Sequence, residues 1–219
     1  TAAYRDAVDA FDRLLDEYPA SKRFRLGWGA AHDAYAAHLV RRGRHSEADP
    51  LLIASRDAFT DLLASQPNDP DYRHQLAAAL SGLADVWSEN GAGPRAQAAL
   101  EQALEIRLAL EREFPDRGEY AHQLGHVLHS TATVLIDRQM PDQARRYLDR
   151  AVEVQEAAVA TVGAPLAYRL ELRRHCQALA ELLIGLGEPG AAAALAERLP
   201  TIVPDDWQGY YDAAGLFAN

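Results

Sequence analysis

The sequence has one cysteine, one methionine and no long apolar run. A single cysteine, Cys176, cannot form an internal disulfide, and this favours a reducing compartment, so we expect a cytoplasmic protein. No apolar stretch approaches the roughly 20 residues that a transmembrane helix needs. We therefore predict no membrane insertion in this chain.

Positive charge is also scarce, with 22 Lys and Arg against 32 Asp and Glu and a formal net charge of −10. Binding to nucleic acid needs clustered basic side chains that release counterions from phosphates, and we predict no nucleic-acid partner. The same balance disfavours an anionic membrane surface. Hydrophobic residues make up 48% of the chain, a share typical of a folded protein, and the abundance of alanine favours helices.

Motifs for phosphoryl-transfer chemistry are missing. The sequence contains no glycine-rich phosphate loop, no His-Arg-Asp catalytic loop and no Asp-Phe-Gly triplet. Gly27 and Gly29 flank Trp28, but this spacing is too short for a nucleotide-binding fingerprint. We predict that the chain is not an enzyme and uses no cofactor; any catalytic domain would lie upstream of Thr1.

What the sequence does contain is a repeat of 48 residues. Its anchors are aromatic: Phe24, Tyr72, Tyr120 and Tyr168. Three further sets keep the same spacing, namely Ala36, Ala84, Ala132 and Ala180; Leu39, Trp87, Leu135 and Leu183; and Ala48, Ala96, Ala144 and Ala192. Coincidences at a single period are the signature of a repeat architecture.

Each repeat is predicted to form two helices. Apolar residues in the second repeat have the spacing of one helical face, at Leu76, Leu80, Leu83, Ala84 and Trp87. Glycine is typical just past a helix end and proline at a helix start. The first helices should therefore end near Gly43, Gly91 and Gly187, and the second should begin near Pro94, Pro141 and Pro189.

One such hairpin cannot bury its apolar faces alone, whereas stacked hairpins can. We therefore predict an all-α fold, a right-handed α-solenoid of about 4.5 stacked antiparallel helical hairpins that covers residues 1–219. Its parts are the second helix of a truncated repeat at 1–18, repeats at 24–67, 72–115, 120–163 and 168–204, and a terminal capping helix at 205–219. Pro50 should delay or kink its helix, and Pro200 should shorten the last second helix.

The pattern from Leu83 to Leu104, "LADVWSENGAGPRAQAALEQAL", resembles the tetratricopeptide repeat (TPR). The matching residues are Leu83, Ala84, Trp87, Ala96, Leu100 and Ala103. The usual TPR has 34 residues, and this repeat has a longer second helix. The long form, with linkers such as "EREFPDRGEY", resembles the TPR regions of planctomycete-type bacterial serine/threonine protein kinases. The resemblance implies a protein-interaction or scaffold module in a bacterial signalling protein.

The resemblance also implies a groove, lined by the first helices, that takes a protein or peptide segment. The corresponding positions include small residues and a set of polar candidates for partner binding: Asp33, Ser81, Asp85, His126, His129, Thr133, Arg174, Gln177 and Glu181. The lysine, arginine and asparagine clamp that some members use for a carboxylate is missing. Self-association through exposed terminal helices is a further partner hypothesis.

Three histidines in "YAHQLGHVLH", His122, His126 and His129, offer an alternative function as a metal- or small-ligand-binding sensor. A His pair four residues apart can chelate zinc, but no glutamate lies between them and no carboxylate or cysteine completes the set. We therefore predict no metal site and interpret these histidines as groove-lining or solvated. Cys176, Trp28 and Trp87 are predicted to pack in the core, and Trp207 to hold the last helix.

Overall fold

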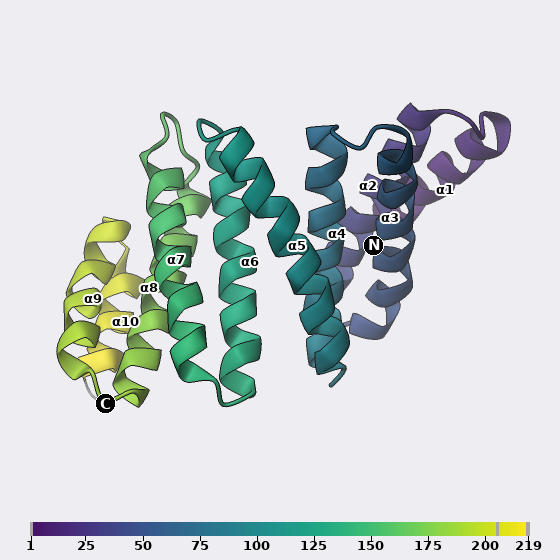
Figure 1. Cartoon of the computed structure of the whole chain (residues 1–219). Coiled ribbons are helices and arrows are strands. Elements are labelled where there is room, and N and C mark those ends of the chain that lie inside the picture. Colours follow the sequence, from purple (N-terminus) through teal and green to yellow (C-terminus); the bar gives the residue numbers. More distant parts are fainter. Residues whose placement is uncertain (1, 205, 218–219) are drawn as a thin grey trace. The chain divides into compact units, whose positions relative to one another are not determined.

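The computed structural model describes residues 2–204 and 206–217, and over these ranges the chain is all α-helical. Figure 1 shows the ten helices of the described residues. Their bounds are α1 Ala2–Glu17, α2 Lys22–Val40, α3 His45–Ser65, α4 Pro70–Glu89, α5 Gly93–Glu113, α6 Gly118–Asp137, α7 Pro141–Ala160, α8 Leu166–Gly185, α9 Pro189–Ile202 and α10 Trp207–Phe217. The predicted all-α fold is confirmed.

The chain divides into two compact units, one ending at Leu110 and the other beginning at Glu111. In the first unit α2 packs against α1 and α3, and α3 packs against α4. In the second unit each helix from α6 to α10 packs against the next one in the chain (Figure 1). The even-numbered helices from α2 to α8 are thus the predicted first helices, the odd-numbered ones are the predicted second helices, and α10 falls in the predicted capping segment. A single array over residues 1–219 stays a prediction.

The repeated alanines of the first helices lie in the core. Ala36, Ala132 and Ala180 are fully buried, and Ala84 is 1% exposed. A small side chain in the middle of a helix lets the neighbouring axes come close together, and leucines then fill the space on either side. In the second unit this core includes Leu148, Leu172, Leu179 and Leu199.

Each first helix ends in the same left-handed turn. Gly43, Gly91 and Gly187 have φ angles of 68°, 72° and 78°, and Gln139 takes the same place in the remaining hairpin with φ 59°. Beyond the turn, the N–H groups of Arg44, Ala92, Met140 and Glu188 donate to the carbonyls of Leu39, Trp87, Leu135 and Leu183. This is the hydrogen-bond pattern of a Schellman motif, and its period is that of the sequence.

Two prolines test the predicted helix limits. The prediction that Pro50 delays its helix is wrong, because α3 begins at His45 and continues through Pro50. Pro50 and Ser46, whose carbonyl loses a helical donor, are both exposed, so water can reach that carbonyl. Pro200 lies two residues before the end of α9, which has 14 residues where α7 has 20.

No helix in the described part of the chain has both the length and the apolar character to cross a membrane. Of the predicted terminal segments, Thr1, Asp205 and residues 218–219 lie outside the described residues. Apart from Tyr18 and Asp206, the remainder of those segments forms α1 and α10.

The turn after α6 yields a prediction about stability. Left-handed backbone costs an L-residue about 1 kcal/mol or more relative to glycine. We expect Gln139→Gly to raise the free energy of unfolding by about 1 kcal/mol, measured by urea denaturation.

The neighbouring substitution Arg138→Gly is the matched control. Arg138 is also exposed, but its φ is −87°, so glycine there gains no relief from strain and should lower stability. Equal effects of the two substitutions would contradict this account of the turn.

Candidate functional site

In the second unit the predicted groove residues lie along two neighbouring first helices. His126, His129 and Thr133 belong to α6, while Arg174, Gln177 and Glu181 belong to α8. Thr133, Arg174 and Glu181 are exposed, and the other three are half-buried. The structure therefore presents three of the six predicted side chains openly to solvent and partly covers the rest.

Local hydrogen bonds hold several of these side chains. The Thr133 hydroxyl donates to the His129 carbonyl at 3.2 Å. The Gln177 amide donates to Glu181 at 3.0 Å, and Arg174 pairs with Glu171 at 3.4 Å. These are bonds within one helix, so a partner that competes for the charged ends need not break a contact between helices.

Beneath this face lies a pair of histidines that links α6 to α8. The Nδ1 atoms of His129 and His175 are 3.0 Å apart, and His175 is fully buried. One imidazole must donate and the other accept, so the two rings cannot both be protonated. Burial, followed by Arg174, lowers the pKa of His129 to about 4. Burial, followed by His129, lowers that of His175 to about 2.

Sequence reasoning missed His175 as part of this site. Glycine at position 125 makes room for its ring, because a Cβ added there would lie 3.2 Å from His175 Nε2. The positions equivalent to His175 in the other repeats are Ala31, Ala79 and Val127. A histidine at a position that is otherwise apolar was the available signal.

The remaining histidine of the predicted metal set has other contacts. His122 Nδ1 lies within 3.2 Å of the Gln155 amide, and its ring stacks on Tyr168 with centroids 4.2 Å apart. The Gln155 amide also donates to the Tyr168 carbonyl at 2.8 Å. Burial lowers the pKa of His122, and the hydrogen bond with Gln155 partly opposes that shift.

Of the two interpretations, groove-lining or solvated, the second does not describe His122 and His129, because both contact neighbouring helices. His126 is half-buried. Within residues 2–204 and 206–217, no group of three or more His, Cys, Asp or Glu side chains is placed to hold a metal ion.

In the first unit, a buried arginine takes the position that Gln155 has in the second unit. Arg107 on α5 is fully buried, and its Nη1 lies 2.8 Å from His74 Nδ1 on α4. Burial raises the pKa of Asp33 on α2 to about 6, and the charge of Arg107 opposes that shift. Phe59, Arg107 and Gln155 are one repeat apart, so the same place holds a ring, a guanidinium and an amide.

The other predicted groove residues of this unit differ in their access to solvent. Ser81 is buried and donates to the Ala77 carbonyl at 2.8 Å. Its hydroxyl is therefore engaged within the helix, and the prediction that Ser81 contacts a partner loses support. Asp33 and Asp85 are half-buried.

The residues assigned to packing divide into two groups. Cys176 and Trp87 are buried as predicted, and burial raises the pKa of the Cys176 thiol to about 11, which leaves it protonated and inert. Trp207 contradicts its predicted packing role because it is 71% exposed. Its exposure follows from its position on α10, which turns Gly209, Ala213 and Leu216 inward instead.

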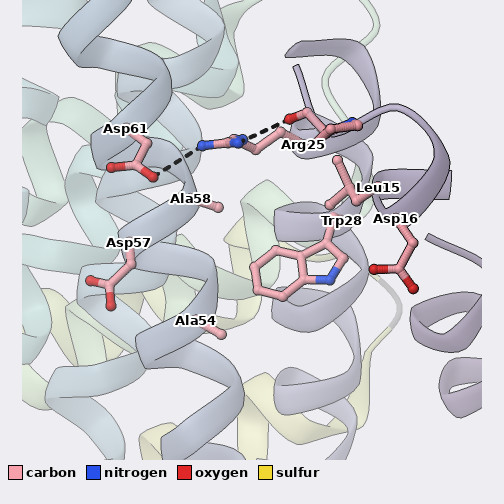
Figure 2. Close-up of a pocket in the computed structure, with 9 residues that line it drawn as sticks. Leu15, Asp16, Arg25, Trp28, Ala54, Asp57, Ala58 and Asp61 are labelled. Carbon is pink, nitrogen blue, oxygen red and sulfur yellow. Dashed lines mark hydrogen bonds and ion pairs between the residues drawn. The ribbon is translucent and has the colours of Figure 1, made fainter. Parts of the chain in front are cut away.

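A cavity of about 410 Å³ lies in the first unit between α1, α2 and α3. Its lining residues are Leu15, Asp16, Pro19, Arg25, Trp28, Ala54, Asp57, Ala58 and Asp61. In Figure 2 the Trp28 ring lies between the α3 side chains and Leu15 and Asp16. Trp28 is thus half-buried and lines a cavity, so its assignment to the core is only partly correct.

Three hydrogen bonds and one ring contact fix the wall of this cavity. Trp28 Nε1 donates to Asp12 at 2.6 Å, and the buried His32 ring packs on Trp28 with centroids 3.9 Å apart. Arg25 donates to Asp61 at 3.1 Å and to the Pro19 carbonyl at 3.2 Å (Figure 2). The indole and the Arg25 guanidinium are therefore held in place by the chain.

Known structures with similar folds are TPR-like repeat proteins. BtubC (BKLC) from P. vanneervenii superposes with a TM-score of 0.71 at 16% identity, over 99% of this chain and 81% of that one. The TPR-like repeats of a Podosopora anserina protein described as a kinesin light chain give 0.62 at 18% identity, over 86% and 85%.

A thermophilic TPR protein from Thermus thermophilus gives 0.50 at 19% identity, over 99% of this chain and 91% of that one. No family model and no curated protein matches the sequence. At these identities the likeness defines the fold class, a TPR-like array of helical hairpins.

The buried histidine pair predicts a dependence of stability on pH. The folded-state pKa values of His129 and His175 lie below the ordinary 6.5 of an unfolded histidine. Their contribution is therefore complete above pH 6.5 and is lost as the pH falls from 6.5 toward 4 and below. Each histidine can change the free energy of unfolding by about 1.4 kcal/mol per pH unit. Urea denaturation at pH 7.5, 6, 5 and 4 measures the slope.

The matched comparison is the double variant His129→Gln/His175→Val, which carries the residues found one repeat away at Gln177 and Val127. The difference between wild type and variant removes the contributions of His122 and Asp33 to a first approximation. We expect this difference to shrink or reverse as the solution is acidified. A difference that stays constant between pH 7.5 and 4 would contradict neutral burial of the pair.

Proposed function

We propose that the chain is a non-catalytic protein-interaction module that binds a protein segment along its first helices. The observation that carries the proposal is the polar face on α6 and α8, where Thr133, Arg174 and Glu181 are exposed and the partly buried His129–His175 bond links the two helices. That bond ties the two helices together. The exposed groups are thus presented from a rigid support, and rigidity lowers the entropic cost of binding.

The chemistry of this face suggests the kind of contact it makes. Arg174 offers a guanidinium, the half-buried His126 an imidazole and Glu181 a carboxylate, and no large apolar side chain is among the six groove positions. A face of this kind suits hydrogen bonds to an extended main chain and a charge-assisted bond between Arg174 and an acidic side chain of the partner.

The larger context of the module is also a proposal. The 48-residue repeat resembles the TPR regions of bacterial serine/threonine kinases, and the fold class supports the scaffold role that this resemblance implies. We infer that the chain is the interaction region of a larger cytoplasmic signalling protein. The partner would then be a substrate or regulator that the module holds near the rest of that protein.

A displayed library of short random peptides, selected on the immobilised chain, tests the groove. We expect the selected peptides to carry an acidic residue and to lose about 10- to 100-fold in affinity when Arg174→Glu reverses the charge they contact. His126→Glu should weaken binding in the same direction. Fluorescence anisotropy with a labelled selected peptide measures the affinities.

Arg146→Glu is the control, because Arg146 is an exposed arginine of the same unit that lies on α7, outside the first helices. It should leave the affinity within about twofold of wild type, since a distant surface charge contributes little at physiological salt. Peptides that respond equally to Arg146→Glu and Arg174→Glu would show that only net charge is recognised. The groove assignment would then be abandoned.

A second candidate function, self-association through a terminal helix, is favoured by the surface of α10. Trp207, Tyr210, Tyr211 and Phe217 are 58–71% exposed, and the spacing of the first three places them on one side of the helix. Gly209, Ala213 and Leu216 face inward on the other side. Clustered exposed aromatic residues are typical of an interface.

We expect the chain to form dimers at micromolar concentration, and Trp207→Ser/Tyr211→Ser to weaken the dimer at least about tenfold through loss of buried apolar area. Sedimentation equilibrium measures both. Leu166→Ser, at a residue that is 59% exposed at the start of α8, is the control and should leave the dimer intact. A wild-type chain that stays monomeric across the concentration range would exclude this interface.

A further inference from the structure

The cavity between α1, α2 and α3 arises from two departures from the repeat. Trp28 stands where the other first helices carry Leu76, Leu124 and Leu172. On α3, Ala54 and Ala58 stand where the later second helices carry the larger pairs Gln102 and Ile106, Arg150 and Val154, and Arg198 and Ile202. A large aromatic wall thus faces two small side chains, and space remains between them.

The second unit shows what can fill such a space. There Arg198 reaches from α9 to form an ion pair with Glu156 on α7. Counted by the repeat, Arg198 corresponds to Ala54 on α3, and Glu156 corresponds to Asp12 on α1. In the first unit the carboxylate is retained and holds the Trp28 indole, while the arginine is replaced by alanine.

The two tryptophans of the first unit each donate a hydrogen bond to an aspartate on another helix. Trp87 Nε1 donates to Asp49 at 2.7 Å, as Trp28 Nε1 donates to Asp12. The Arg95 guanidinium lies 4.1 Å from the centre of the Trp87 ring. The Trp28 ring has different surroundings, because it packs against the His32 ring with centroids 3.9 Å apart and also lines the cavity.

The charges around the cavity select a cation. Asp16, Asp57 and Asp61 line it, and Arg25 is the only basic residue among its lining residues. Arg25 is bound to Asp61, and Asp57 pairs with Arg56 at 2.7 Å. The carboxylate of Asp16 on α1 is exposed, and the sum over the cavity wall is negative.

We propose that this cavity binds an arginine side chain from a partner protein, with the guanidinium beside the acidic wall and the aliphatic stem against Trp28. A guanidinium stacks favourably on an indole ring and can also donate hydrogen bonds to a nearby carboxylate. The volume of about 410 Å³ lies within the range of ligand pockets, roughly 300–1,000 Å³.

This site is separate from the proposed groove. The pocket uses Arg25 and Trp28 of α2, whereas the predicted groove positions on the same helix are Ala30, Asp33 and Ala37. Either site can therefore fail experimentally without affecting the other.

The test is a titration of the isotopically labelled chain with a blocked glycine- and serine-rich peptide that contains one arginine. The three tryptophans, Trp28, Trp87 and Trp207, give three indole N–H signals that can be assigned by substitution. We expect the Trp28 signal to shift saturably and the Trp87 signal to stay in place. A peptide with citrulline in place of arginine keeps the shape and loses the charge, and it should bind at least about tenfold more weakly.

Two variants complete the design. Ala54→Arg restores the arginine found at Arg198 and should fill the pocket from within, which abolishes the peptide-induced shift. Asp16→Asn/Asp57→Asn leaves the volume unchanged and should weaken binding about tenfold, which covers the case in which Ala54→Arg fails to fold. Because Trp28 remains in both variants, the same signal reports every titration.

The proposal is overturned by an unmoved Trp28 signal at millimolar arginine peptide, by equal binding of the citrulline peptide, or by full binding to either variant.

Discussion

Close contact between helices at the alanine positions is the constraint on which the rest of the structure depends. Ala36, Ala132 and Ala180 have no exposed surface, and any larger side chain there would push neighbouring helices apart. Because the backbones are fixed at these points, positions one repeat apart occupy the same place in successive hairpins. Differences in chemistry along the chain therefore arise from side chains placed on a nearly constant framework.

The polar interior illustrates this relation. Phe59, Arg107 and Gln155 occupy one repeat position, yet only the latter two make polar contacts, with His74 and His122 respectively. A buried polar group is costly unless it is paired, so each requires a partner on another helix. These pairs make the two units chemically distinct while the helix packing is preserved. They also place neutral imidazoles directly under a surface that is offered to solvent.

The fold could be predicted because its determinants are local and periodic. Helix length, the left-handed turn and the small residues at contacts all follow from spacing within one repeat, whereas the delayed helix start expected from Pro50 is wrong. The candidate sites were harder to predict from the sequence than the fold. Whether His175 is buried depends on Gly125 and His129, about one repeat away, and the sequence gives no direct measure of that encounter. The cavity beside Trp28 exists because the small side chains of Ala54 and Ala58 leave space unfilled. Such unfilled space has no sequence motif by which it could be predicted.

The constant turn after each first helix has a consequence for how the chain can change in length. Its hydrogen bonds use the same offsets in all four hairpins, so an added residue there would break both the left-handed step and the bond that follows it. Three connections that lead from a second helix into the next first helix are also alike, with four residues and one hydrogen bond of the same offset. The connection between α7 and α8 is one residue longer and leaves Val162 fully exposed next to Gly163. Insertions are best tolerated where the backbone makes few fixed bonds. An added segment, a fused reporter or a second binding element is thus best placed in the connection between α7 and α8.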